Sequence, residues 1–287
     1  MLIHSLLFFL RESSLAADLT RAERCLKSLE KSNFKTVVIY NQGFWSNDEL
    51  KDYLKSFSLN YTVIGSGTNV GIVNGRQACF EWIFQNLTNV PFVSELHLDM
   101  IFTHNWETPL IDYLNSKDEP VIGCGIVDKY GQMPFQTMIE PPPFDDFNKL
   151  DNYLAKLRSD SVIHGFTHPC IHKMDILKEI GGLNTTLLNG KQAFEDDSLL
   201  LGYHYYYGTK TNWKPKVNYN SVVYHEIGGQ RYDLADSVMV NFEGLVRQYG
   251  AMGLKQLANI HANDWSVKFF TQQYNFILEN ARSLEIF

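Results

Sequence analysis

In the stretch YTVIGSGTNVGIVNGRQACFEWIFQNLTNVPFVSELHLD, residues 61–99, a short apolar run precedes a glycine-rich loop, a helical pattern and a second apolar run. The pattern predicts a strand at 61–64, a loop at 65–71, a helix at 72–87 and a strand at 91–99. A strand, a helix and a second strand in this order make a βαβ unit with parallel strands. The stretch therefore predicts an α/β fold.

The same alternation continues on both sides of this unit. Strand and helix alternate four times within about 100 residues, which is typical of a mostly parallel sheet. Upstream, we predict strands at 2–10 and 36–40, each followed by a helix, the second of which begins with a Ser46–Glu49 capping box. Downstream, we predict a strand at 121–127, a proline-rich loop at 141–144, helices near 148–158 and 195–206, strands near 214–219 and 222–225, and helix from 234 onward with a break near 250–253.

Composition excludes several classes of protein. The 287 residues carry a formal charge of −7 without a Lys/Arg cluster, so we expect no nucleic-acid partner. The longest apolar run, residues 6–10, is too short to span a bilayer, and the N-terminus lacks the features of a signal peptide. Four widely spaced cysteines without a CxxC pair favour a reduced protein and a cytoplasmic location.

Polar and glycine-rich segments follow the predicted N-terminal strands. They are Arg11, then Asn41-Gln42-Gly43, then the loop 65–71, and finally His97 and Asp99. Ligands of open α/β sheets bind at the carboxyl ends of the strands, so this edge predicts a nucleotide pocket. The loop 65–71 matches neither GxxxxGK[ST] nor GxGxxG.

His97-x-Asp99 is the most informative local pattern. Alternation along a strand would place both side chains on one face, where an imidazole and a carboxylate can hold a divalent ion that bridges a diphosphate. The alternative is that His97 packs in the core and Asp99 caps the next helix.

Two further patterns lie downstream. Glu195-Asp196-Asp197 opens a predicted helix, where the acids either compensate the helix dipole or supply a general base. His225 follows a strand and precedes Gly228-Gly229 and Arg231, which suits a metal ligand followed by a phosphate-binding loop. The alternative for His225 is a structural role.

Six segments in this order resemble those of glycosyltransferase family 2, a family of inverting nucleotide-sugar transferases. They are NVGIVNGRQ at 69–77, HLDM at 97–100 with NWETPL at 105–110, CGIVDKYG at 124–131, CIHK at 170–173 with EIGGLN at 179–184, FED at 194–196, and His225. Gln77 stands where the family has Asn, and Lys173 where it has Arg.

The resemblance implies the GT-A fold: a Rossmann-like, mixed but mostly parallel sheet flanked by helices. It covers residues 1–232, with a nucleotide-binding half at 1–119 and an acceptor and catalytic half at 120–232. Residues 233–287 would form a helical extension, for which we expect homo-oligomerisation. Peripheral membrane association is the alternative, although Lys and Arg are sparse there.

The resemblance also implies a site. A sugar would pass, with inversion, from a nucleoside-diphosphate donor, a UDP-sugar by preference, to a hydroxyl of a glycan, lipid-linked or protein acceptor. Asp99 and His225 would hold Mn²⁺ or Mg²⁺. Asp196 would be the general base, Asp197 its substitute, and Glu195 a further catalytic acid. Donor-binding residues would be Arg11, Asn41, Gly65, Asn69, Arg76, His97 and Arg231.

Several alternatives stay open at this point. The preferred alignment places His97 and Asp99 on the family's D-x-D, whereas the other places Asp99 and Ile101 there. Asn41 or Gln42 stands where the family has the Asp that contacts uracil. The rival functions are a retaining transferase, a non-catalytic nucleotide- or glycan-binding protein and, least favoured, a nucleotidyltransferase. Trp213 and residues 205–207 would stack on the acceptor or pack in the core.

Overall fold

The structure is a computed structural model that describes residues 1–134, 136, 138–144, 146–208, 212–227 and 235–284. Its N-terminal half alternates strands and helices as expected. The elements are β1 (Leu2–Phe8), a 3₁₀ turn (Glu12–Ser14), α1 (Leu15–Leu29), β2 (Thr36–Asn41), α2 (Asn47–Leu54), β3 (Asn60–Gly65), α3 (Ile72–Asn86), β4 (Phe92–Leu96) and β5 (Met100–Ile101). The predicted capping box is present at the start of α2.

The second half is more irregular. Its elements are α4 (Thr108–Ser116), β6 (Val121–Val127), α5 (Phe147–Lys156), β7 (Val162–His164), β8 (Cys170–Lys173), α6 (Met174–Glu179), α7 (Glu195–Tyr203), a π-helical turn (His204–Gly208), β9 (Lys216–His225), α8 (Ala235–Ile260) and α9 (Asp264–Leu284). The two short strands expected near 214–219 and 222–225 are one strand, β9, which continues through a register shift opposite Cys124 and Gly125.

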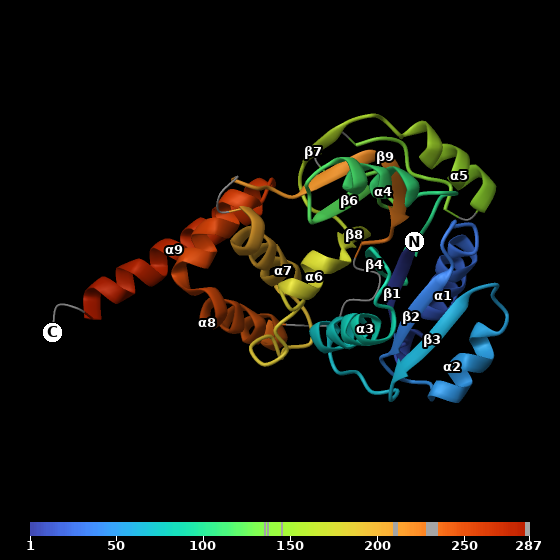
Figure 1. The fold of residues 1–287 in the computed structure, drawn as a ribbon, viewed down its shortest axis with the longest axis horizontal. Coiled ribbons are helices and arrows are strands. Elements are labelled where there is room, and N and C mark those ends of the chain that lie inside the picture. Colours follow the sequence, from blue (N-terminus) through green and yellow to red (C-terminus); the bar gives the residue numbers. More distant parts are fainter. Residues whose placement is uncertain (135, 137, 145, 209–211, 228–234, 285–287) are drawn as a thin grey trace.

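All the strands join one mixed sheet, in the order β3-β2-β1-β4-β8-β6-β9-β5, with β7 paired to β9 (Figure 1). Strands β3, β2, β1 and β4 run parallel, and so do β6 and β9. Strand β8 inserts antiparallel between β4 and β6. The expected α/β class, a mixed sheet flanked by helices, is confirmed.

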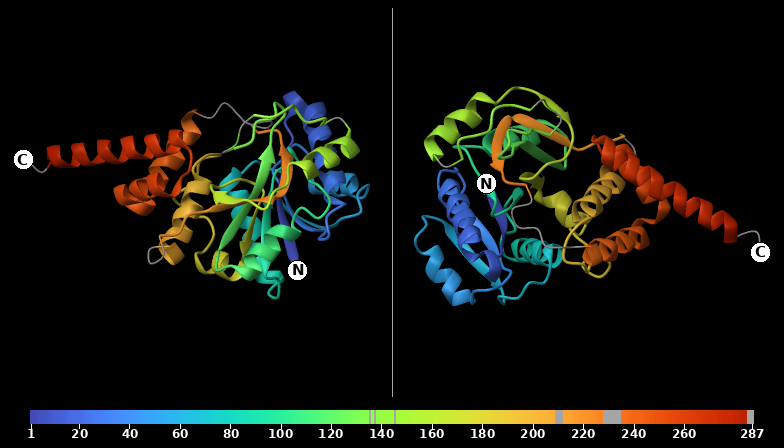
Figure 2. Two further views of the ribbon diagram at one scale, coloured as in Figure 1. Left: turned by 90° about the horizontal axis from the view of Figure 1, so that it is seen from above. Right: turned by 180° about the vertical axis from the view of Figure 1, so that it is seen from behind.

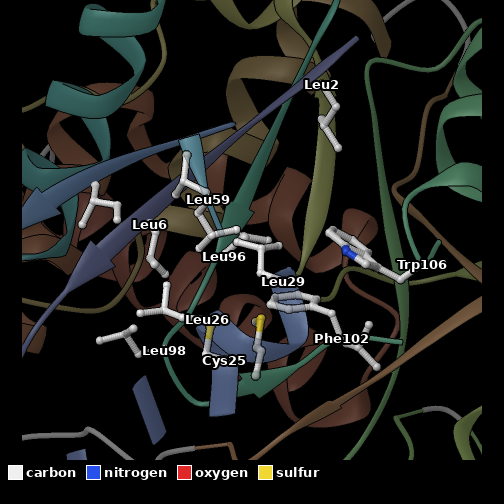
Figure 3. Packing of buried hydrophobic residues seen from close by; sticks show 14 of the residues in the cluster. Leu2, Leu6, Cys25, Leu26, Leu29, Leu59, Leu96, Leu98, Phe102 and Trp106 are labelled. Carbon is white, nitrogen blue, oxygen red and sulfur yellow. The ribbon is translucent and has the colours of Figure 1, made fainter. Parts of the chain in front are cut away.

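Alternating side chains of the strands build a core on each face of the sheet. Leu2 and Leu6 of β1 pack with Leu26 of α1 and with Trp106, as Figure 3 shows. Ile3 of the same strand points to the other face and belongs to the core beneath α3, α7 and α8. Burial on both faces explains why the N-terminal strands read as continuous apolar runs.

The C-terminal helices pack on α7 rather than forming a separate unit. Leu245, Leu254 and Leu257 of α8 are buried in the core that α7 also enters. Gly250 interrupts α8 with φ +65°, which confirms the expected break. Helix α9 projects away from the sheet (Figures 1 and 2) and exposes Trp265 and Phe276. Oligomerisation through these helices stays a prediction, and the boundary at residue 232 lies outside the described residues.

Within the described residues, no helix is both long enough and apolar enough to cross a bilayer. The cytoplasmic location stays a prediction.

Candidate active site

A hollow of about 440 Å³ opens at the carboxyl ends of β1, β2, β4, β6 and β9. This volume lies in the range of small-ligand sites. The N-terminus of α7 closes one side of the hollow. Of the predicted site residues, the structure brings seven to this hollow: Asn69, Arg76, His97, Asp99, Glu195, Asp196 and His225.

His97, Asp99 and His225 lie together in this hollow. His225 Nε2 lies 3.3 Å from Asp99 Oδ1 and 3.5 Å from His97 Nδ1. Each of the three can direct one ligand atom within 4.8 Å of the others. The expected reason was wrong, however: β4 ends at Leu96, so strand alternation does not place His97 and Asp99 on one face.

Pairing of β5 with β9 produces this arrangement instead. Met100 lies opposite His225 in the antiparallel ladder, and the backbone N–H of Glu226 donates to the Asp99 carbonyl at 2.9 Å. Met100 thus pairs with His225 and Asp99 with Glu226, which holds Asp99 and His225 next to each other.

The protonation of His97 follows from its neighbours. Burial, together with the charges of His168 and Arg76, lowers the pKa of His97 well below its usual range, so the ring is neutral. Its Nε2 lies 2.8 Å from Arg76 Nη2, a group that can only donate. We therefore assign the proton to Nδ1, which faces His225 and the hollow. In this tautomer Nδ1 of His97 can donate a hydrogen bond and offers no lone pair to a metal ion.

Asp99 is held ionised despite its burial. Burial raises its pKa, but the hydrogen bond and charge of His225 outweigh that effect and lower the pKa to about 2. The ionised carboxylate of Asp99 and the imidazole of His225 both line the hollow.

The three acids at the start of α7 have different surroundings. Asp196 Oδ1 accepts from Arg76 Nη1 at 2.7 Å and from His168 Nε2 at 3.0 Å. Burial opposes ionisation of Asp196, yet the charges of His168 and Arg76 lower its pKa well below the usual range. Burial and the charge of Asp196 raise the pKa of Glu195, whose Oε2 is buried without a hydrogen-bond partner among the described residues.

Asp197 points elsewhere. Its Oδ1 lies 2.6 Å from His261 Nε2 at the end of α8, and Asp197 is not among the residues that line the hollow. The structure therefore gives the substitute role of Asp197 no geometric support. Asp197 instead connects α7 to the helical extension.

Arg76 lines the hollow, and its guanidinium is paired with other protein groups. Its side chain is only 4% exposed, and its Nε pairs with Glu95 Oε2 at 3.1 Å while Nη1 and Nη2 reach Asp196 and His97. These three contacts occupy the guanidinium, which leaves it little capacity to bind a diphosphate. Lys191, which the sequence did not single out, is an exposed cation on the hollow's lining.

A second, more open hollow of about 840 Å³ adjoins the first and shares Phe9, Gln42 and Asn69 with it. It is lined at the ends of β1, β2 and β3 by Arg11, Gly43, Phe44, Gly67 and Thr68 among others. The expected donor edge of the sheet is therefore concave.

Two of the expected donor residues, Asn41 and Gly65, line neither hollow, and a third, Arg11, lines the open one. Asn41 is fully buried, and its amide group contacts Trp45, Asn47 and the Gly43 N–H, so the alternative, Gln42, is the residue that lines the hollows. Gly65 lines neither hollow described here; it turns the chain with φ +85° beneath Tyr40. Arg11 does line the open hollow, with its guanidinium paired to Asp18. Arg231 lies outside the described residues.

Asn241 of α8 shapes the segment that precedes α7. Its Nδ2 donates to the carbonyls of Gln192 and Ala193, and its Oδ1 accepts from the Gly190 N–H at 2.7 Å. Ala193 and Phe194 both have positive φ, at 81° and 60°, directly before Glu195. Such backbone persists where surrounding contacts enforce it. The hydrogen bonds of Asn241 thus fix the backbone that orients Glu195 and Asp196 at the start of α7.

His168, Lys191 and Asn241 were missed by sequence reasoning. His168 follows no periodic pattern, and only the antiparallel insertion of β8 brings it to Asp196. Trp213 is 6% exposed, donates to Glu119 and packs against Tyr203, so the core alternative holds for it. Tyr205 and Tyr206 are exposed, but they do not line the hollow.

No protein-family model matches the sequence, and no curated protein matches it significantly. Solved structures do match. The fold resembles that of S. aureus TarS. The TM-score is 0.55 at 13% identity, over 96% of this chain and 43% of that one.

TarS residues 1–349 in complex with UDP-GlcNAc match with a TM-score of 0.54 at 14% identity, over 96% of this chain and 71% of that one. The complex of the same fragment with UDP matches at 0.50, also at 14% identity, over 91% and 80%. The present chain spans less than half the length of the longer TarS structure. At these low sequence identities, the structural similarity establishes the fold alone.

Proposed function

We propose that this protein transfers a sugar from a nucleoside diphosphate, UDP by preference, to a hydroxyl group. The observation that carries the proposal is the convergence of Asp99, His225 and Asp196 on one hollow at the carboxyl edge of a GT-A-like sheet. TarS, which shares the fold, has been solved with UDP-GlcNAc and with UDP, and this supports UDP-sugars as the first donors to test.

The donor would extend across both hollows. The nucleoside would lie in the open hollow, against Phe44 and the backbone of Gly43 and Gly67, and its diphosphate would enter the adjoining one past Asn69. There His97 would donate its Nδ1 proton to a phosphate oxygen, and Lys191 would balance charge. In this arrangement the buried Arg76 binds no phosphate and remains paired with Glu95 and Asp196.

The residues fit a divalent cation. Asp99 and His225 would supply a carboxylate oxygen and an imidazole nitrogen, which lie 3.3 Å apart. Diphosphate oxygens would complete the ligand set. An imidazole nitrogen suits Mn²⁺ better than Mg²⁺, which prefers oxygen donors. Such a cation, when bound, acts as a Lewis acid that stabilises the leaving diphosphate.

In the transfer step, the acceptor hydroxyl oxygen forms a bond to the anomeric carbon while the bond from that carbon to the diphosphate oxygen breaks. The hydroxyl proton moves to Asp196. We propose a single displacement, which inverts the anomeric configuration and releases the nucleoside diphosphate. Acceptors of the glycan, lipid-linked and protein classes all present the required hydroxyl.

The test is a transfer assay with UDP-, GDP- and TDP-sugars, with Mn²⁺ and a panel of hydroxyl acceptors, comparing wild type with Asp196→Asn. The expected result is release of nucleoside diphosphate and a glycosylated product of inverted configuration by NMR, with turnover lost in Asp196→Asn. A product of retained configuration would contradict single displacement, and undiminished turnover in the variant would contradict the base. The exposed Asp264→Asn serves as the matched control.

One observation favours a second candidate, a nucleotide-binding protein without transfer activity. His97 stands at the place where the family resemblance predicts an acid, so the site has one carboxylate fewer. This candidate predicts that calorimetry detects nucleotide binding. It also predicts that the transfer assay detects neither donor hydrolysis nor transfer.

A further inference from the structure

His168 donates to the same oxygen of Asp196 as Arg76 does. Arg76 Nη1 and His168 Nε2 lie 2.7 and 3.0 Å from Oδ1. Both donors are almost fully buried, whereas the Asp196 side chain is 36% exposed. Among the described residues, no hydrogen bond involves Oδ2. Two fixed donors therefore hold one oxygen and leave the other for the hollow.

The buried residues behind His168 determine which of its nitrogens carries the proton. Cys170 Sγ lies 3.5 Å from His168 Nδ1. Burial raises the pKa of the Cys170 thiol, so it keeps its proton and can donate to Nδ1. An imidazole that accepts a hydrogen bond at Nδ1 carries its proton on Nε2, the nitrogen that faces Asp196.

Cys170 Sγ has two further polar neighbours in this cluster, His172 Nε2 at 3.1 Å and Glu95 Oε1 at 3.9 Å. His172 Nε2 lies 2.8 Å from Glu95 Oε1, while its Nδ1 lies 2.7 Å from Tyr203 Oη. If Tyr203 donates to Nδ1, then Nε2 carries the proton that Glu95 accepts. Both ring nitrogens of His172 then have partners without the thiol proton. The Cys170 thiol can therefore donate to His168 Nδ1 without conflict with the other hydrogen bonds of the cluster.

We propose that His168 is a positioning residue for Asp196. In the orientation it holds, Asp196 Oδ2 faces the acceptor and Oδ1 faces the protein. This inference rests on the proposed role of Asp196 as general base. Burial makes the arrangement rigid: Cys170 is fully buried and His168 is 7% exposed. Small displacements of a reacting group can cost about 10²-fold in rate, which is the scale expected when the contact is lost.

Two substitutions of similar size separate the nitrogens of His168. In His168→Gln the side-chain amide reaches the place of Nε2 and can still donate to Asp196. In His168→Asn the amide reaches only the place of Nδ1. We expect His168→Asn to lose about 10²-fold in kcat with little change in donor KM, and His168→Gln to recover most of that loss. Equal loss in both variants, or loss in neither, would overturn the proposal. His104→Asn, an exposed histidine off the site, is the control.

Cys170 provides a second pair of variants in case substitution of His168 impairs folding. Cys170→Ser keeps a donor to Nδ1, and Cys170→Ala removes it. The proposal predicts higher kcat in Cys170→Ser than in Cys170→Ala at equal thermal stability, and the reverse order would overturn it.

A structural measurement separates this proposal from the proposed function. Crystal structures of His168→Asn and His168→Gln report the Asp196 side chain without any need for turnover. Wild-type protein that transfers no sugar would contradict the proposed function. An Asp196 side chain unmoved in His168→Asn would overturn the positioning role, whatever the activity.

Discussion

His97 Nδ1 and His225 Nε2 lie 3.5 Å apart, although one follows β4 and the other ends β9. Their chemical roles differ because their neighbours differ. Arg76 occupies Nε2 of His97 and forces the proton onto Nδ1, whereas His225 Nε2 faces the carboxylate of Asp99. We therefore expect one of these histidines to bind a metal ion and the other to bind a phosphate oxygen.

This difference is measurable in the free protein. His225→Gln and Asp99→Asn are expected to weaken Mn²⁺ binding by more than about tenfold, since even residues outside a metal's ligand set contribute that much. His97→Gln, the matched control, is expected to leave Mn²⁺ affinity nearly unchanged and to weaken donor binding. Titration of free Mn²⁺ by electron paramagnetic resonance measures the first effect and calorimetry with UDP the second. Equal weakening in His97→Gln would make His97 a ligand.

Phe44 is expected to stack on the nucleobase. It lines the open hollow, is 49% exposed and has φ 74°, an unusual combination for a large apolar residue. Stacking of a base on an aromatic ring is worth about 1–3 kcal/mol, so Phe44→Ala should raise the Kd for UDP by roughly tenfold. Phe276→Ala, an exposed phenylalanine on α9, is the control. Unchanged UDP affinity in Phe44→Ala would place the base elsewhere.

Asn241 is expected to control activity from outside the hollow. Asn241→Asp has nearly the same shape but removes the donors to the Gln192 and Ala193 carbonyls. Leaving buried carbonyls unpaired costs about 1–3 kcal/mol, and the segment that aims Glu195 and Asp196 should relax. We expect lower stability in urea and lower kcat. Asn275→Asp on the exposed side of α9 is the control, and full turnover in Asn241→Asp would show that the segment needs no such support.

His4 is expected to make stability depend on pH. Burial lowers its pKa from 6.5 to about 4, although a hydrogen bond with the Phe34 carbonyl opposes the shift. Because the unfolded chain takes up the proton first, stability from this group is complete above pH 6.5 and is lost as pH falls toward 4. The loss should be about 3 kcal/mol.

Urea unfolding at several pH values checks this expectation. The difference between wild type and His4→Gln should shrink as pH falls from 6.5 to 4. A constant difference over that range would contradict the pKa shift.

Local patterns predicted the first half of the fold well because its elements are local. Strands β1, β2 and β4 are buried on both faces, and most of their residues are therefore apolar. The strand at 91–99 was predicted too long, because the apolar Leu98 continues the run after the chain has turned. Strands β7 and β8 were missed because they are short and lie in a segment with mixed composition.

The candidate site was predicted only in part, for a similar reason. Asp99, His225 and Asp196 were found because each follows a strand or opens a helix. Arg76 was expected to face a diphosphate, but α3 packs against the sheet and turns this side chain toward Glu95 and Asp196. Asn41 was expected to face the base, whereas its amide closes the turn that follows β2.

By itself the sequence determined the order of the elements, the glycine-rich edge of the sheet and the positions of the acids and histidines, because hydrophobic periodicity and capping act over a few residues. Only the tertiary structure decided which of those groups meet. The β5–β9 pairing joins Asp99 to His225, and the insertion of β8 brings His168 to Asp196. Such contacts depend on strand order and register, which no local pattern encodes. The protonation states of the site side chains also depend on the tertiary structure, because burial and charged neighbours exist only in the folded chain.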